Sequence, residues 1–172
     1  MKLFALGLAF AVSAAACGAT LDEPHHAVLG DPTERVHDGG HVKLWIPPGW
    51  AVDQENTDTL VMSAPDQTVS LEVTLLDAKD LAGALAGVTL AALIDYDHLE
   101  LVGAPQSGDV NGMNALFQAG HATYKGNPVE LSVGVLDTPA QKYLLVLGEA
   151  SSDAFAEHES TIREVMHRIH PI

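Results

Sequence analysis

The chain has 172 residues, of which 47% are hydrophobic, and its 23 acidic and 8 basic side chains give a formal net charge of −15. This length predicts one domain that can bury a sizeable core without disulfide bonds. Because the cations are scattered and the chain as a whole would repel phosphates, the composition argues against nucleic acid as a partner and against direct binding to anionic lipid head groups.

The first segment, residues 1–17, has the features of a bacterial signal peptide. Lys2 precedes an apolar run from Leu3 to Val12, which is too short to cross a bilayer because a spanning helix needs roughly twenty residues. Small residues then lead to Cys17, the only cysteine in the chain. An unpaired thiol at this boundary favours a lipoprotein, in which Cys17 becomes the N-terminus and carries acyl chains.

The residues before Cys17 resemble the lipobox of bacterial lipoproteins. Ala14-Ala15-Ala16-Cys17 differs from that motif at one position, because Ala14 stands where the motif usually has leucine. An ordinary signal peptidase that recognises Ala-x-Ala is the alternative. The resemblance implies membrane attachment through an N-terminal lipid. Gly18, rather than aspartate, after the cysteine implies an outer membrane lipoprotein of the bacterial cell envelope that faces the periplasm, with the inner membrane and the cell surface as alternatives.

Residues 18–40 are expected to form a flexible tether. They are rich in Asp, Glu, His, Pro and Gly and contain few apolar side chains that a core could bury. A lipid-anchored domain needs such a spacer to stand off the membrane surface. We therefore place the folded domain at residues 41–172.

Alternating apolar residues predict the first strands of this domain. The alternation in His41–Ile46 ends at Pro47-Pro48-Gly49, because proline cannot donate to a strand ladder and Pro-Gly favours a turn. The chain resumes in extended form over 50–52 and again over 59–63. A strand over 68–76 is expected to have one dry face and one wet face. Its dry face carries Val69, Leu71, Val73 and Leu75, and its wet face carries Ser70, Glu72 and Thr74.

Two helices interrupt the later strands. Apolar residues at three- and four-residue spacing predict a helix over 79–95, with Asp77 as its candidate cap. Strands are predicted over 98–102, 113–124, 129–136 and 143–147, and turn residues separate them. Ser151-Ser152-Asp153 is expected to cap a last helix over 154–168. This order predicts the α+β class, a curved antiparallel sheet with helices packed on it.

A resemblance to known families covers residues 42–172. Leu44-Trp45-Ile46-Pro47-Pro48-Gly49-Trp50 resembles the opening signature of the PsbP-like and DcrB-like families. The families continue with strands like Val110–Tyr124 and Tyr143–Leu147 and with a helix like Phe155–Ile169. The resemblance implies an α/β/α sandwich, in which the antiparallel sheet is flanked by helices. It supplies no shared catalytic residues, so it implies a protein that binds or assembles.

We expect any binding surface to lie on a sheet face or beside the proline corner. The residues of that corner are Trp45, Pro47, Pro48, Gly49 and Trp50. Independently of the resemblance, the prolines fix the bend and the two tryptophans supply apolar area that closes one end of the sheet.

Two groups of side chains are candidates for metal sites. His37 and His41 stand close together in the chain, and imidazole is a common zinc ligand, but a Gly-Gly loop between them does not preorganise a site. Asp95 and Asp97 stand at a predicted helix end, where a cation would relieve their interaction with the helix dipole, yet their spacing matches no calcium loop. Both groups are weak candidates, and we expect no metal and no other cofactor.

The sequence contains no nucleophile motif of the Gly-x-Ser-x-Gly kind and no glycine-rich phosphate loop after a strand. The protein is therefore expected not to be an enzyme. We interpret it as a lipid-anchored envelope protein that acts as a binding or assembly module, with an envelope protein or a small molecule as its partner. The alternative is a periplasmic carrier of metal or small ligands that uses the acidic and histidine clusters.

Overall fold

The computed structural model describes residues 33–54 and 56–172, which form an α+β fold of two helices and two antiparallel sheets. The predicted class is therefore confirmed. In chain order the elements are β1 (Thr33–His37), the short 3-10 helix η1 (Asp38–Gly40), β2 (Val42–Ile46), β3 (Ala51–Gln54), β4 (Thr59–Ser63), β5 (Val69–Leu76), α1 (Leu81–Asp95), β6 (Asp97–Val110), β7 (Met113–Tyr124), β8 (Asn127–Asp137), β9 (Tyr143–Ser151), α2 (Phe155–His167) and β10 (His170–Pro171).

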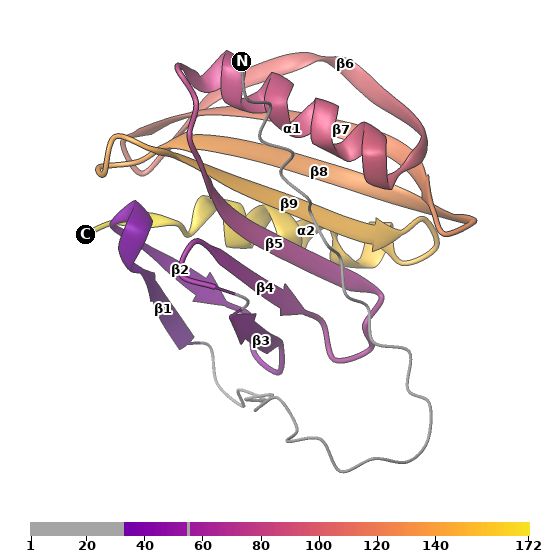
Figure 1. Cartoon of the computed structure of the whole chain (residues 1–172). Coiled ribbons are helices and arrows are strands. Elements are labelled where there is room, and N and C mark those ends of the chain that lie inside the picture. Colours follow the sequence, from indigo (N-terminus) through magenta and orange to yellow (C-terminus); the bar gives the residue numbers. More distant parts are fainter. Residues whose placement is uncertain (1–32, 55) are drawn as a thin grey trace.

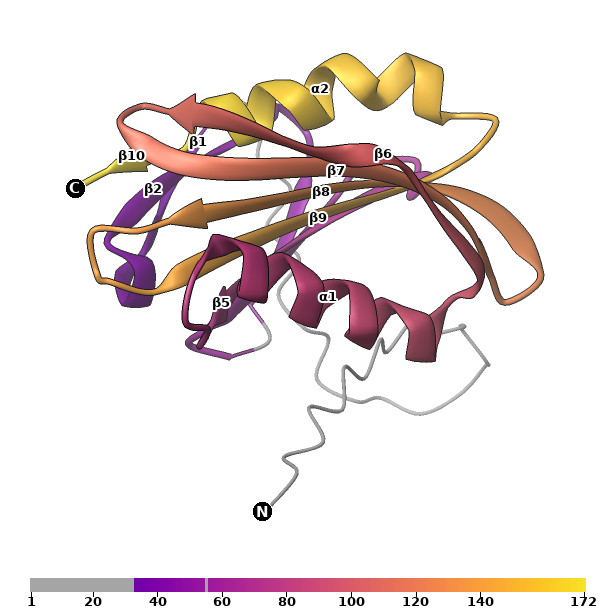
Figure 2. The same ribbon diagram turned by 90° about the horizontal axis from the view of Figure 1, so that it is seen from above.

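The larger sheet has the strand order β3-β4-β5-β9-β8-β7-β6 and is antiparallel throughout (Figure 1). Seen from above, α1 covers one face of this sheet and α2 covers the other (Figure 2). The smaller sheet, β1-β2-β10, lies on the α2 side and shares its core. The result is the flanked sandwich that the family resemblance implied.

The α2 face holds the larger part of the core. β2 turns Val42, Leu44 and Ile46 inward in the predicted alternation, and α2 meets them with Ile162 and Val165. All five side chains are at most 2% exposed. Burial of each such side chain stabilises the fold by roughly 1.5–3 kcal/mol, so this layer is a main source of stability.

The α1 face holds a second cluster. Leu85 and Val88 of α1 are buried against strands β7, β8 and β9, as their spacing predicts. Valines and leucines that alternate along β8 and β9 form the sheet side of this cluster. Both faces of the central strands are therefore covered, which explains why β9 reads as a continuous apolar run.

The folded domain begins earlier than predicted. β1 and η1 occupy residues assigned to the tether, and β1 pairs with β2 from Thr33↔Ile46 to His37↔Val42. The sequence pattern did not reveal this strand because its middle residues are polar and exposed, as suits the edge of a sheet. Residues 1–32, which include the predicted signal peptide, Cys17 and most of the tether, lie outside the described residues.

Three other local predictions were wrong. Glu72 and Thr74, placed on the wet face of β5, are each 7% exposed because α1 packs on this face of the sheet. Asp80 caps α1 in place of Asp77, since its Oδ1 accepts the backbone N–H of Gly83 at 2.7 Å. The start of α2 has no side-chain cap, although Ser151-Ser152-Asp153 was expected to supply one.

No helix within 33–54 and 56–172 combines the length and apolar character needed to cross a membrane.

Candidate functional site

A cavity of about 640 Å³ lies between α1 and the sheet, over strands β4, β5 and β9. Pockets for small molecules have volumes of roughly 300–1,000 Å³, so this cavity has the size of a ligand site. It forms because α1 packs chiefly across the β6–β9 half of the sheet and leaves the β4–β5 half of the same face less covered. The β3–β4 loop and the segment that leads from β5 into α1 complete its rim.

The helix contributes small side chains to the cavity. Gly83, Ala84 and Gly87 of α1 line it, next to Val88. A Cβ atom at Gly87 would meet no other atom within 4 Å, so the missing side chain there leaves open space. Glycine inside a helix costs about 0.5–1 kcal/mol relative to alanine. The sequence therefore keeps the cavity open at some cost in helix stability.

Two buried threonine side chains, Thr59 and Thr74, line the sheet side of the cavity, and the buried Glu72 bonds to the second of them. Thr59, Glu72 and Thr74 are 9%, 7% and 7% exposed, and Thr59 lies opposite Thr74 in the β4–β5 ladder. The Oγ1 atom of Thr74 lies 2.7 Å from Oε1 of Glu72 and 3.2 Å from Oγ1 of Thr59. A carboxylate oxygen without a proton accepts hydrogen bonds. Thr74 therefore donates to Glu72, and its oxygen also lies within hydrogen-bond distance of the Thr59 hydroxyl.

Tyr96, which follows α1, closes one end of the cavity. Its hydroxyl donates to Oε2 of Glu149 on β9 at 2.5 Å. Burial raises the pKa of Glu149, while the Tyr96 hydrogen bond and the charge of Lys125 act in the opposite direction. Burial, followed by the charge of Glu149, raises the pKa of Tyr96. The phenol therefore keeps its proton and directs it at Glu149.

The proline corner, by contrast, lies mainly in the core of the α2 face. Trp50 is 4% exposed and Pro47 is buried, whereas Pro48 is exposed. The corner turns through Gly49, whose φ of 78° suits glycine. Trp45 is half-buried, and the guanidinium of Arg168 lies 4.6 Å from its ring centre. The corner and the cavity are on opposite faces of the large sheet.

Where the structure describes them, the residues named as weak metal candidates do not form a metal site. His37 is 5% exposed, and its Nε2 lies 3.2 Å from the carbonyl oxygen of Asp58, while His41 is exposed after η1. Asp97 is exposed at the start of β6, and the side chain of Asp95 is outside the described part. In the part of the chain that the structure describes, no three His, Cys, Asp or Glu side chains come together as a metal site would require.

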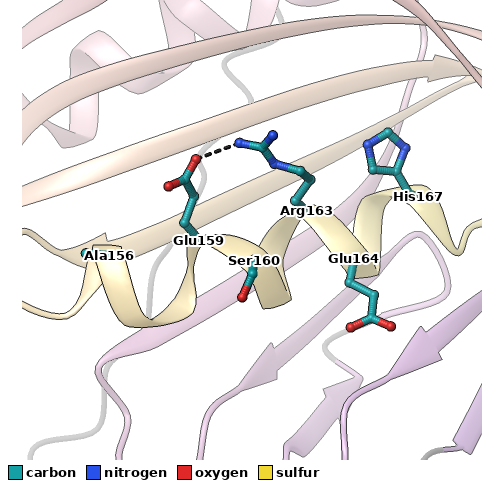
Figure 3. Close-up of a pocket in the computed structure, with 6 residues that line it drawn as sticks. All are labelled: Ala156, Glu159, Ser160, Arg163, Glu164 and His167. Atoms are coloured by element: carbon teal, nitrogen blue, oxygen red, sulfur yellow. Dashed lines mark hydrogen bonds and ion pairs between the residues drawn. The ribbon is translucent and has the colours of Figure 1, made fainter.

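A second hollow lies along the solvent side of α2 (Figure 3). Its volume is about 550 Å³, and all the residues that line it come from this one helix. Arg163 donates to Glu159 across it at 2.6 Å, and both side chains are exposed. A single helix face encloses little of a ligand, so the cavity beneath α1 is the stronger candidate.

Part of this site was visible in the sequence pattern, but not as a site. The polar face of β5 was assigned correctly by its alternation, but as a solvent face. Tyr96 and Glu149 are 53 positions apart in the chain, so no local pattern joins them. One usable signal was the pair of glycines one helical turn apart in α1, because isolated glycines inside a helix often have a packing or functional reason.

Comparison with known proteins identifies the fold. No family model and no curated protein matches the sequence. The solved structure of cyanobacterial PsbP (CyanoP) from Synechocystis sp. PCC 6803 is similar with a TM-score of 0.65 and 13% identity, over 92% of this chain and 98% of that one. The chain therefore has a PsbP-like fold, as the resemblance implied.

Two further structures share this fold at low identity. PA94 from Pseudomonas aeruginosa, a protein of unknown function described as a putative regulator, has a TM-score of 0.53 and 17% identity, over 81% of this chain and 96% of that one. The Ran-binding protein Mog1p of Saccharomyces cerevisiae has a TM-score of 0.56 and 15% identity, over 81% and 95%. At these identities the similarity establishes the fold and leaves function to the site.

Proposed function

We propose that the protein is a non-catalytic binding module of the bacterial envelope, which holds a small amphipathic molecule in the cavity between α1 and the sheet. One observation carries this proposal. The cavity combines the volume of a ligand site with apolar walls from Val88, Leu145 and Leu147 and with a few buried polar groups. Small-molecule sites are typically built in this way.

The chemistry of the cavity supports binding rather than catalysis. The Tyr96 hydroxyl donates to Glu149, and its raised pKa makes a nucleophilic phenolate inaccessible near neutral pH. The Thr59 and Thr74 hydroxyls are joined to Glu72 in one hydrogen-bonded chain. A binding role also has a precedent on this fold, since the yeast neighbour is named a Ran-binding protein.

The place of action is proposed from Cys17 and the apolar run before it. Acyl chains on this cysteine would hold the domain at the membrane without a spanning helix, because two or more chains anchor a protein stably. Cells fed an alkyne-labelled fatty acid should label the wild-type protein and leave Cys17→Ser unlabelled. An unlabelled wild-type protein released into the medium would contradict the anchor and leave the cavity proposal standing.

The cavity itself can be tested with N-phenyl-1-naphthylamine, an uncharged dye that fluoresces in apolar surroundings. The full chain should bind one dye molecule with increased fluorescence. The substitution Gly87→Leu should weaken dye binding by about ten-fold or more. Gly87 lines the cavity, so the leucine side chain should occupy part of the cavity volume. The variant should stay folded, since leucine favours a helix more than glycine does.

Ala86→Leu is the matched control. Ala86 is an exposed neighbour on α1 that does not line the cavity, so this substitution adds the same side chain outside it. Dye affinity should stay within about two-fold of the wild type in this variant. Absence of dye binding, or equal losses in both variants, would reject the cavity as the site.

A further inference from the structure

We infer that His37 is a positioning residue of the ligand site, which holds the cavity rim at Asp58 and so makes ligand affinity depend on the docking of strand β1. The inference rests on the proposed function, because it concerns the control of that same site. It follows from a side-chain contact that joins the small sheet to the rim of the cavity.

The small sheet reaches the cavity from behind. It lies on the α2 side, yet His37, the last residue of β1, places its Nε2 atom 3.2 Å from the carbonyl oxygen of Asp58. Asp58 lines the cavity, in the segment between β3 and β4. Since a carbonyl oxygen can only accept a hydrogen bond, Nε2 carries the proton and donates it. The imidazole therefore fixes the backbone of the rim.

Asp58 joins several parts of that rim. Its carbonyl oxygen also accepts the N–H of Leu75, at the end of β5, at 3.0 Å. The N–H groups of Asp58 and Thr59 both donate to Oδ1 of Asn56, at 2.8 Å and 2.9 Å. All four of these residues line the cavity. A shift of the Asp58 carbonyl should therefore move several lining residues together.

The chemistry of His37 favours this role over simple filling of the core. The side chain is 5% exposed, and its Nδ1 atom is buried with no hydrogen-bond partner among the described residues. A buried polar atom without a partner lowers stability. An apolar side chain of similar size would avoid this cost but would leave the Asp58 carbonyl without its donor. The bond made by Nε2 thus explains why a histidine stands here.

The turn after His37 packs against the same rim residues. A Cβ atom at Gly39, in η1, would lie 2.5 Å from Cδ1 of Leu75 and 3.5 Å from Oδ1 of Asp58. The first of these distances is too short for a real contact, so the absence of a side chain lets η1 close against Leu75. The end of β1 and η1 together support this part of the cavity from outside.

Strand β1 is held to the rest of the fold along one edge. In the described sheet it pairs with β2 alone, and it follows most of the predicted tether. A ligand that contacts the rim and a strand that holds the rim must stabilise each other, because coupling between two binding events is reciprocal. Affinity should therefore fall when His37 releases Asp58, and a bound ligand should hold β1 in place.

The first test measures the affinity of the full chain for N-phenyl-1-naphthylamine in two variants. His37→Leu keeps a buried side chain of similar size but cannot donate, and it should weaken dye binding by about five-fold, the effect of losing one hydrogen bond. His37→Gln retains a side-chain N–H that can donate to the Asp58 carbonyl. It should bind the dye within about two-fold of the wild type.

Val165→Ala is the control for lost stability. Val165 is fully buried under α2 and does not line the cavity. Its truncation removes core volume and should lower the urea midpoint. Dye affinity should nevertheless stay within about two-fold of the wild type in this variant.

The second test needs no substitution in the rim, so it holds even if His37→Leu folds poorly. Hydrogen exchange of residues 33–37 in the wild type, followed by mass spectrometry, should become slower when the dye is saturating. The segment 155–167, which is α2, should change little, because it lies on the other face of the large sheet.

The outcomes separate this inference from the proposed function. Dye binding that His37→Leu leaves unchanged, or that His37→Gln weakens as much as His37→Leu, would overturn the role of His37 and leave the cavity as a ligand site. Equal losses in His37→Leu and Val165→Ala, or exchange in 33–37 that ignores the dye, would also overturn it. No dye binding by the wild type would reject the proposed function and this inference together.

Discussion

Asn111 joins two parts of the molecule through a single side chain. It stands in the β6–β7 turn with a φ of 52°, and its Nδ2 donates to the backbone oxygens of His167 and Ile169 at 2.9 Å and 2.7 Å. Carbonyls at the end of a helix have no partner within the helix. The turn therefore caps α2 and fixes the β6–β7 hairpin against it.

The substitution Asn111→Ala should lower the free energy of unfolding by about 1–3 kcal/mol, because two carbonyls lose their donor and alanine disfavours a positive φ. Urea denaturation measures the change. Asn127→Ala, at the first residue of β8 directly after the next turn, is the control and should cost less than about 0.5 kcal/mol. If both variants lose the same stability, the cap is not the reason for it.

A second residue-scale prediction concerns pH. Burial raises the pKa of Glu149 in the folded protein above its value in the unfolded chain, so the folded state takes up a proton more readily. The stability that this provides is present at low pH and is lost as pH rises through the folded pKa. Glu149→Gln removes this titration but keeps an acceptor for Tyr96.

The unfolding free energy of the wild type, relative to that of Glu149→Gln, should therefore rise as pH falls from 7 to about 4.5. Urea midpoints for both proteins across this range measure the trend. A difference that stays constant with pH, or that falls towards low pH, would contradict the assigned direction.

Single residues show which features could be predicted from the sequence and which could not. The turn at Asn111 was predicted from its local residues, but its capping role was not, since the bonded carbonyl of His167 is 56 positions away. Trp50 was correctly expected to supply apolar area, and the structure buries it. What a side chain contacts across the fold depends on layers that local patterns do not specify.

Helix α1 decides whether the cavity exists. Its buried stripe holds it on the β6–β9 half of the sheet, while its glycines keep the remaining space open. Asp80 fixes where the helix begins, because its carboxylate accepts the N–H of Gly83, one of the residues that line the cavity. The cap and the site are thus parts of one short segment.

Asp80→Ala should cost about 1 kcal/mol, the usual effect of losing an N-cap, and Asp77→Ala should cost clearly less. Hydrogen exchange at the amides of Gly83 and Ala84 should speed up in the first variant, because the first turn of the helix frays. Thermal unfolding gives the global change. Equal effects of the two substitutions would mean that the cap does not hold this end of the helix.

The spacing of apolar residues in the sequence predicted most of the helices and strands. The strand over 59–63 has the predicted bounds, and both helices lie within two residues of theirs. β1 was missed because an exposed edge strand does not alternate, and β6 is longer than predicted because register shifts interrupt its pattern. Local pattern predicts an element best where one face is buried.

On the scale of the whole molecule, the two faces of the large sheet differ in how completely other elements cover them. The α2 face is closed by a helix and by the small sheet, and it holds the proline corner in its core. Among the residues that the structure describes, one helix covers the α1 face, and part of this face remains as a cavity. The sequence predicted the class and the layers, but not this asymmetry, because it depends on where each helix crosses the sheet.

The most direct test of the binding site uses the protein isolated from its own membranes. Native mass spectrometry should find the wild type and Ala86→Leu with one additional small molecule, and Gly87→Leu without it, since only the last substitution fills the cavity. A molecule carried equally by all three proteins, or by none of them, would contradict a ligand site beneath α1.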